Sequence, residues 1–151
     1  MIEPDWRQAF DAVPDLAMVL DAEHRIVSAN RAVVKRYGDV VGRRCYEVVH
    51  GADAPPPGCP HADLLRDGRE HIAEVADEES GGTLSISVSP LCDGRGRMVG
   101  AVHVARDITA QARTIATARR RARPAGHLAP MSRRRVSRLR HGRRRRLPGG
   151  R

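Results

Sequence analysis

Two cysteines and two histidines that could do chemistry together lie within a stretch of 17 residues. They are Cys45, His50, Cys59 and His61. Two thiolates and two imidazoles could form a tetrahedral zinc site or hold an iron cofactor. Their spacing contains no close pair such as Cys-x-x-Cys, which anchors standard zinc sites. We therefore expect a small core residue at Cys45, a loop thiol at Cys59 and solvated histidines, with metal binding as the alternative.

The same two cysteines could also form a redox switch. A disulfide between Cys45 and Cys59 would tie the loop between them to the preceding helix, but this chemistry needs exposed thiols of low pKa. Arg43 and Arg44 precede Cys45. At most one of them can lower the pKa of the thiol, because consecutive helical positions point about 100° apart. The chain has three cysteines, an odd number that favours thiols or metal ligands over a disulfide framework.

No catalytic motif accompanies these residues. The sequence contains no Gly-x-Ser-x-Gly, no phosphate-binding loop, no His-Glu-x-x-His and no kinase or cyclase signature. The acidic run Asp77–Glu79 precedes Gly81-Gly82 and is typical of a solvated turn. We therefore expect no enzyme activity from this chain.

Charge divides the chain into two parts. Residues 1–109 carry 12 basic against 18 acidic residues, a net charge of −6, whereas residues 110–151 carry 15 arginines and no acid. The second part predicts a disordered tail that could bind nucleic acid through phosphate contacts. An abrupt loss of acidic residues past Asp107 also suggests a shifted reading frame or a truncation that replaced an output domain. No apolar run reaches the ~20 residues of a membrane span, and we expect a cytoplasmic protein.

Hydrophobic periodicity predicts one α+β domain. Trp6, Phe10 and Val13 recur at helical steps before Pro14, Asn30 can cap a helix that ends at Gly38, and four prolines in residues 51–60 exclude regular structure. A short helix follows at 61–66. Alternation or apolar runs predict strands at 16–20, 25–28, 72–76, 84–88 and 98–105. These five strands would form an antiparallel sheet with short helices on one face.

Three segments at matching places resemble the PAS family. They are Val19–Asp21 with Ile26–Asn30, the stretch Val41–Val48 (VGRRCYEV), and Gly100–Thr109, which closes with Asp107, Ile108 and Thr109. The resemblance implies a sensing domain over residues 10–109. It leaves unexplained the tail over 110–151, and the periodicity of Trp6 and Phe10 predicts a helical lead-in over 1–9. The resemblance also implies dimerisation and a signal that leaves through Asp107, Ile108 and Thr109.

The cysteine segment resembles a subset of this family in which the second half reads Pro-Cys-x-x-Cys-Pro. Pro56 stands where that subset has its first cysteine, so the thiol pair is incomplete. The resemblance leaves the cofactor open. A haem would need an axial ligand, for which His61 and His71 are the candidates, whereas no flavin motif is present and aromatic residues make up only 3% of the chain.

A pocket between sheet and helices would suit a small apolar or weakly polar ligand. The alternative is that the same residues simply fill the core. The candidate lining residues are Leu16, Met18, Val33, Tyr37, Leu65, Ile72, Ile86 and Val102.

The expected function is that of a sensory and dimerising module of a bacterial signalling protein, such as part of a sensor histidine kinase in a two-component system. A small ligand or the redox state would be the signal. The alternative is a regulator that binds nucleic acid and controls transcription through its Arg-rich tail.

Overall fold

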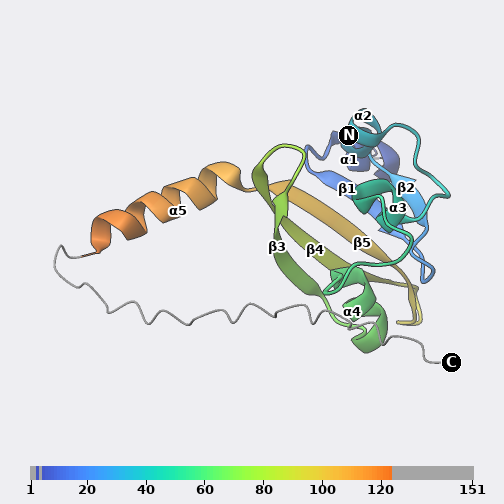
Figure 1. The fold of residues 1–151 in the computed structure, drawn as a ribbon. Coiled ribbons are helices and arrows are strands. Elements are labelled where there is room, and N and C mark those ends of the chain that lie inside the picture. Colours follow the sequence, from blue (N-terminus) through green and yellow to red (C-terminus); the bar gives the residue numbers. More distant parts are fainter. Residues whose placement is uncertain (1–2, 4, 124–151) are drawn as a thin grey trace, which may run out of the picture.

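A computed structural model of the chain describes residue 3 and residues 5–123, and it has the predicted α+β architecture (Figure 1). A five-stranded antiparallel sheet carries several short helices. In chain order, the elements are α1 (Trp6–Ala12), β1 (Leu16–Leu20), β2 (Ile26–Ala29), α2 (Arg31–Tyr37), α3 (Cys45–His50), α4 (Pro60–Asp67), β3 (His71–Asp77), β4 (Gly82–Cys92), β5 (Met98–Asp107) and α5 (Thr109–Ala122).

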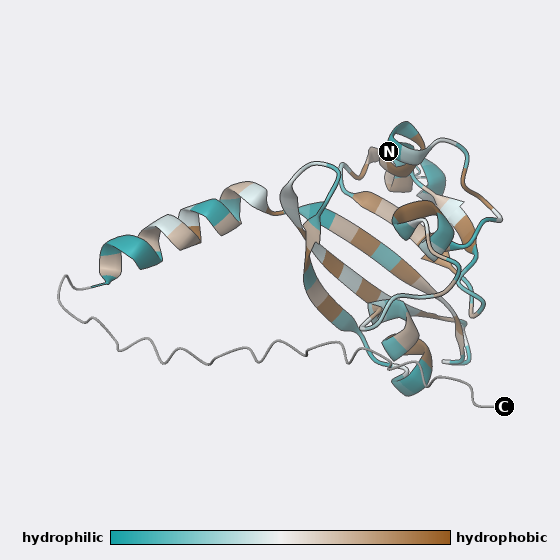
Figure 2. Cartoon of the chain, viewed as in Figure 1, coloured by the Kyte–Doolittle hydropathy of each residue, from teal (hydrophilic) through white to brown (hydrophobic). Residues whose placement is uncertain are grey.

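The strands lie in the order β2-β1-β5-β4-β3, so the two ends of the domain meet at the centre of the sheet. β1 pairs with β5 over five residues, and the last three strands form the predicted meander. The alternating sequence of β4 sets which side chains face inward, since successive residues point to opposite faces. Ile86 and Val88 are buried as predicted, and Figure 2 shows the corresponding alternation of hydropathy along the strands.

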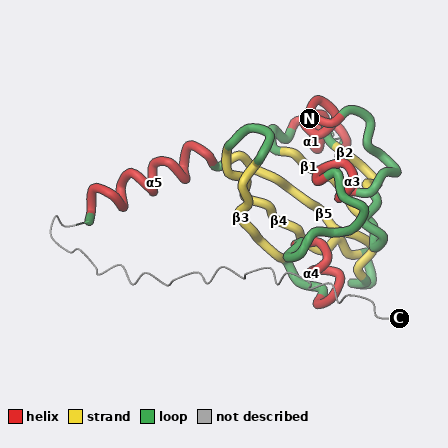
Figure 3. Tube along the Cα trace, in the orientation of Figure 1, coloured by secondary structure: helices red, strands yellow, loops and turns green. Residues whose placement is uncertain are grey.

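The helices between β2 and β3 cover one face of the sheet, and a long loop joins α3 to α4 (Figure 3). Two groups of buried apolar side chains lie beneath them. The first contains Met18, Leu20, Ile26, Val33 and Val40. The second contains Leu64, Ile86, Val88, Ala101 and Ala105.

The β1–β2 and β4–β5 hairpin turns share one hydrogen-bond pattern, in which an aspartate side chain accepts two backbone N–H groups. In the β1–β2 turn, the Asp21 carboxylate accepts the N–H groups of Glu23 and Arg25. In the β4–β5 turn, Asp93 accepts those of Arg95 and Arg97. Each turn has one residue of positive φ just before the arginine: Gly96 (φ 76°) in the second, and His24 (φ 63°) in the first. A histidine therefore occupies a left-handed position that usually takes glycine.

The buried side chain of Asn30 ties the start of the sheet to α2. Its Oδ1 accepts the N–H groups of Ala17 and Val33, and its Nδ2 donates to the carbonyls of Val13 and Asp15. Asn30 is 0% exposed. The predicted helix cap is thus confirmed, and it also satisfies every strong hydrogen-bonding position of a buried amide.

The last helix departs from expectation. Residues 110–122, predicted to be disordered, form most of α5, because alanine, glutamine and arginine favour helix and three arginines lie in its last turn. The rest of the predicted tail, 124–151, lies outside the described residues, as do residues 1, 2 and 4 of the lead-in, whose residues 6–9 belong to α1. Within the described part, no helix is both long and apolar enough to span a membrane.

Replacing Asn30 with Asp should destabilise the domain. The two shapes match, but a carboxylate cannot donate to the carbonyls of Val13 and Asp15 and is costly to bury. We expect a loss of about 2–4 kcal/mol in the free energy of unfolding, measured by urea denaturation. Gln111→Glu makes the same chemical change on an exposed position of α5 and should change stability by less than about 0.5 kcal/mol. Equal effects of the two substitutions would contradict this role of Asn30.

Candidate functional site

A cavity of about 260 Å³ lies between the sheet and the helices. Leu16, Met18, Leu84, Ile86 and Ala105 form its floor on the strands. Its roof comes from the helices and from the proline loop, including Tyr37, Tyr46, Val49 and residues 56–60. The wall is mostly apolar, and its volume lies just below the usual range of ~300–1,000 Å³ for ligand pockets. It therefore suits a ligand smaller than a haem or a flavin.

Histidines supply unpaired polar atoms at this cavity. His61 is 1% exposed, and its Nε2 has no hydrogen-bond partner among the described residues. The same holds for Nδ1 of His103 on β5. Burial lowers the pKa of each imidazole to about 4. Both rings are therefore neutral at pH 7, and each presents an atom that a ligand could satisfy.

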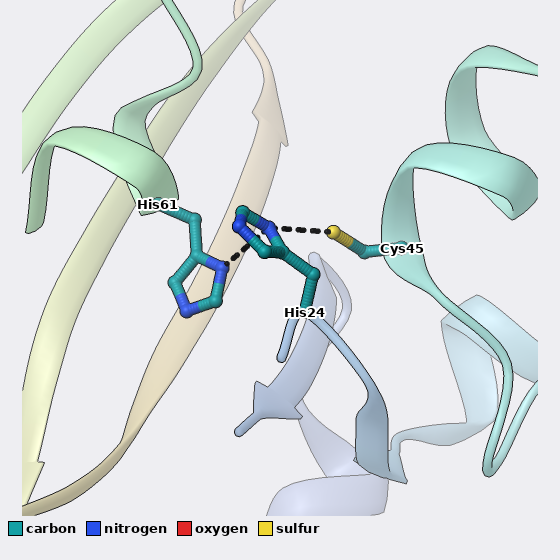
Figure 4. A group of neighbouring side chains, drawn as sticks. All are labelled: His24, Cys45 and His61. Carbon is teal, nitrogen blue, oxygen red and sulfur yellow. Dashed lines mark hydrogen bonds between the residues drawn. The ribbon is translucent and has the colours of Figure 1, made fainter. Parts of the chain in front are cut away.

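Three side chains from three separate elements converge beside this cavity (Figure 4). The Nδ1 atoms of His24 and His61 are 3.0 Å apart, and the Cys45 Sγ lies 3.9 Å from the His24 Nδ1. His24 comes from the β1–β2 turn, Cys45 begins α3 and His61 lies in the first turn of α4. The backbone N–H of Cys45 donates to the carbonyl of His24 at 2.9 Å, which joins the two elements directly.

The thiols show little sign of redox activation. Burial, followed by the charge of nearby Cys59, raises the pKa of Cys45 to about 11. A thiol of this pKa is almost fully protonated at neutral pH, whereas redox sensing needs a thiolate. Cys45, Cys59 and Cys92 are all free, and Cys92 is exposed.

The structure places four of the eight candidate lining residues at the cavity. Leu16, Met18, Tyr37 and Ile86 line the cavity. The other four candidates do not line the cavity, and the alternation of side chains along a strand explains two of these, Ile72 and Val102. Ile72 is 68% exposed because His71, Ala73 and Val75 are the β3 residues that turn inward, and Val102 lies between the inward-facing Ala101 and His103. Val33 is buried in the first core group, and Leu65 packs against the second.

Of the four residues first considered for metal or redox chemistry, the structure brings Cys45 and His61 together. His50 and Cys59 line the cavity outside this cluster. The expectation of solvated histidines is correct for His50 but wrong for His61, because α4 packs its N-terminal turn against the sheet. His71, the other haem candidate, lies at the start of β3 and pairs with Asp67 at 2.9 Å.

Sequence reasoning missed His24 and His103. A signal for His24 was present, since Asp21–Arg25 and Asp93–Arg97 share the pattern Asp-x-x-x-Arg and differ at the position where glycine is favoured. His103 sits in an apolar strand with inward-facing alanines on either side, so its alternation indicated an inward imidazole.

The exit segment is tied to the neighbouring strand. Asp107 accepts the Thr109 N–H at 2.8 Å, and the Thr109 hydroxyl accepts the Thr83 N–H at 3.0 Å. The Ile108 N–H donates to the Thr83 carbonyl at 2.9 Å. The residue after Thr83 is Leu84, which lines the cavity, so the cavity floor and the start of α5 share one strand.

Comparison with known proteins gives a consistent result. A family described as "PAS fold" matches residues 10–113. A PAS domain from Colwellia psychrerythraea is 22% identical with a TM-score of 0.53, covering 68% of this chain and 93% of its own. An RNA-binding light-oxygen-voltage receptor is 18% identical with a TM-score of 0.61, covering 78% of this chain and 36% of its own.

A third structure, the photoactive yellow protein domain of the sensor histidine kinase Ppr from Rhodospirillum centenum, is 21% identical with a TM-score of 0.50. It covers 66% of this chain and 91% of its own. No curated protein matches the chain in sequence. At these identities the solved structures establish the fold.

Thiol labelling should distinguish the three cysteines. With iodoacetamide at pH 7.5, exposed Cys92 should react first and Cys45 slowest, because its pKa of about 11 and its burial keep it protonated and covered. Mass spectrometry of peptides would give the three rates. Cys92→Ser should remove the fast phase alone, and rapid alkylation of Cys45 at pH 7.5 would contradict the assignment.

Proposed function

The chain belongs to the PAS fold family, and from this premise we propose that it is a sensory domain whose signal is a small ligand bound in the cavity between helices and sheet. The observation that carries this proposal is the apolar cavity of about 260 Å³ with two buried, unpaired imidazole nitrogens. A core that merely filled space would leave neither the volume nor the orphaned atoms.

The chemistry of the wall narrows the ligand class. Aliphatic and proline side chains favour an apolar body, and neutral His61 and His103 favour one hydrogen-bonding group on it. A hydroxyl fits well because it can both donate and accept. We therefore propose a compact ligand, smaller than haem, that carries a hydroxyl or carbonyl group.

The proposed signal leaves through β4 and the exit segment. Leu84 and Ile86 touch the cavity, while Thr83 holds Ile108 and Thr109 by two hydrogen bonds. A ligand that shifts β4 would therefore change the anchorage of α5, which extends away from the sheet (Figure 1). Coupling of this kind requires that the ligand favour one of two arrangements of the anchor.

We also propose the class of protein to which this domain passes its signal. This chain contributes sensing and dimerisation, without catalysis of its own, to a bacterial regulator of the histidine-kinase or transcription-factor class. The fold similarity to the sensory domain of a histidine kinase supports this class. Binding of nucleic acid through residues 110–151 stays a prediction, favoured only by the 15 arginines of that segment.

Two probes that differ by one hydroxyl test the ligand class. Phenol should bind the cavity about 2–10-fold more tightly than benzene, because one hydrogen bond to a buried group contributes roughly 0.5–1.5 kcal/mol. Amide NMR titration of the full chain would give both affinities and the residues that respond. The preference for phenol should disappear in His103→Leu.

His71→Leu, which removes a histidine outside the cavity, is the matched control and should keep the preference. Shifts confined to surface residues, or equal affinities for the two probes in the wild-type chain, would overturn the proposal.

Thr109→Val should uncouple the cavity from α5. The variant keeps the shape of the side chain but removes the acceptor for the Thr83 N–H, so this amide should exchange with deuterium several-fold faster. Phenol should change the protection of residues 109–113 in the wild type and not in the variant. Thr117→Val, which removes only a bond to the Arg113 carbonyl within α5, should leave the coupling intact, and an identical phenol response in Thr109→Val would contradict the relay.

A further inference from the structure

The donor atoms at the centre of Figure 4 lie close enough together to hold one metal ion. One donor atom from each of His24, Cys45 and His61 lies within 4.8 Å of the other two. In a tetrahedral zinc site with Zn–N near 2.0–2.1 Å and Zn–S near 2.3 Å, ligand atoms lie about 3.3–3.8 Å apart. The observed 3.0 Å between nitrogens and 3.9 Å between nitrogen and sulfur fall close to this range on either side. The third pair, Cys45 and His61, lies within 4.8 Å, so side-chain rotations are needed to place all three donor atoms around one ion.

The backbone of His24 adopts an unfavourable conformation that directs its side chain toward Cys45 and His61. Its φ of 63° is the only positive value among the non-glycine residues that the structure describes. A left-handed conformation is unfavourable for a residue with a side chain, and the equivalent turn of β4–β5 avoids it with Gly96. The imidazole is instead directed inward, against the rings of Tyr46 and His61. Strain of this kind is typical of functional positions.

The pairing of the two imidazoles is incomplete without an ion. With Nδ1 atoms 3.0 Å apart, one ring must donate and the other accept. The remaining His61 nitrogen, Nε2, is buried and has no partner within the part of the chain that the structure describes. Neutral imidazoles and a thiol are the donor set that zinc-class metals prefer, whereas calcium and magnesium require oxygen ligands.

We propose that His24, Cys45 and His61 bind a divalent transition metal ion of the zinc class. Cys59 supplies the fourth ligand. In the structure Cys59 lies outside the three-residue cluster, but it is on the wall of the same cavity and one residue before α4, so its side chain must move to reach the ion. Binding forms a metal–sulfur bond at each thiol and releases the thiol protons to solvent. The resulting site has two nitrogens and two sulfurs.

The ion also determines what the cavity recognises. Once Nδ1 of His61 is bound to the metal, its ring proton must reside on Nε2, which then becomes a donor toward the cavity. Metal occupancy thus favours ligands that carry an acceptor. This consequence rests on the proposed ligand function, whereas the metal site itself does not.

Cobalt titration of the full, tag-free, reduced chain tests the site directly. One equivalent of Co²⁺ should give thiolate-to-cobalt charge-transfer absorption and the visible bands of tetrahedral cobalt, and Zn²⁺ should abolish both. His24→Gly and Cys45→Ser should each weaken binding by more than the ~10–100-fold that loss of an outer partner causes. Cys59→Ser should roughly halve the charge-transfer intensity.

His24→Gly separates loss of the ligand from loss of the fold, because glycine suits the left-handed turn. Its urea midpoint without metal should equal or exceed that of the wild type, and Zn²⁺ should raise the melting temperature of the wild type alone. Cys92→Ser and His71→Ala should bind cobalt as the wild type does. Tight binding that survives in Cys45→Ser or His24→Gly, or absence of the charge-transfer band, would overturn the proposal. Neither outcome depends on phenol binding, so the two proposals fail independently.

Discussion

The helix layer and the sheet are joined at their start by the buried amide of Asn30, and the cavity depends on this connection. Its four hydrogen bonds reach Val13, Asp15, Ala17 and Val33, and thereby hold the entry to β1 against the first turn of α2. β1 contributes Leu16 and Met18 to the cavity floor, and α2 contributes Tyr37 to its roof. An amide satisfied at all four positions is rigid because any displacement would leave a buried polar group unpaired.

In contrast to the fully hydrogen-bonded Asn30 amide, two imidazole nitrogens at the cavity have no hydrogen-bond partner among the described residues. His61 is buried and His103 is half-buried, both are neutral, and each has one buried nitrogen without a hydrogen-bond partner among the described residues. The backbone of His24 is strained, because its left-handed conformation, which directs the imidazole toward His61, is unfavourable for a residue with a side chain. A sensory domain requires such local incompleteness, since a ligand can shift an equilibrium only by interactions that differ between two states. The hydrogen bonds from Thr83 to Ile108 and Thr109 give that shift a route to α5.

The sequence predicted the fold far better than the site, for physical reasons. Alternation in Leu84–Val88 and the cap at Asn30 are local patterns, so the five strands and the helix start followed from them. Four of the eight candidate lining residues lie at the cavity. Ile72 does not, because the register of a strand decides which face each side chain takes, and it places Ile72 on the outer surface. The metal candidates omitted His24, because the cluster unites residues that are 16 to 37 positions apart along the chain. Spacing rules describe ligands that share one element, and these come from three.

The central claim, that imidazoles at the cavity form a site for a metal and a ligand, is tested most directly by long-range ¹H–¹⁵N NMR of the histidine rings during Zn²⁺ addition. At one equivalent of Zn²⁺, the Nδ1 resonances of His24 and His61 should move to metal-bound values. The His61 proton should then be found on Nε2, and His71 should remain unchanged. Ring resonances of His24 and His61 that do not respond to zinc, or a His61 proton that stays on Nδ1, would contradict this claim.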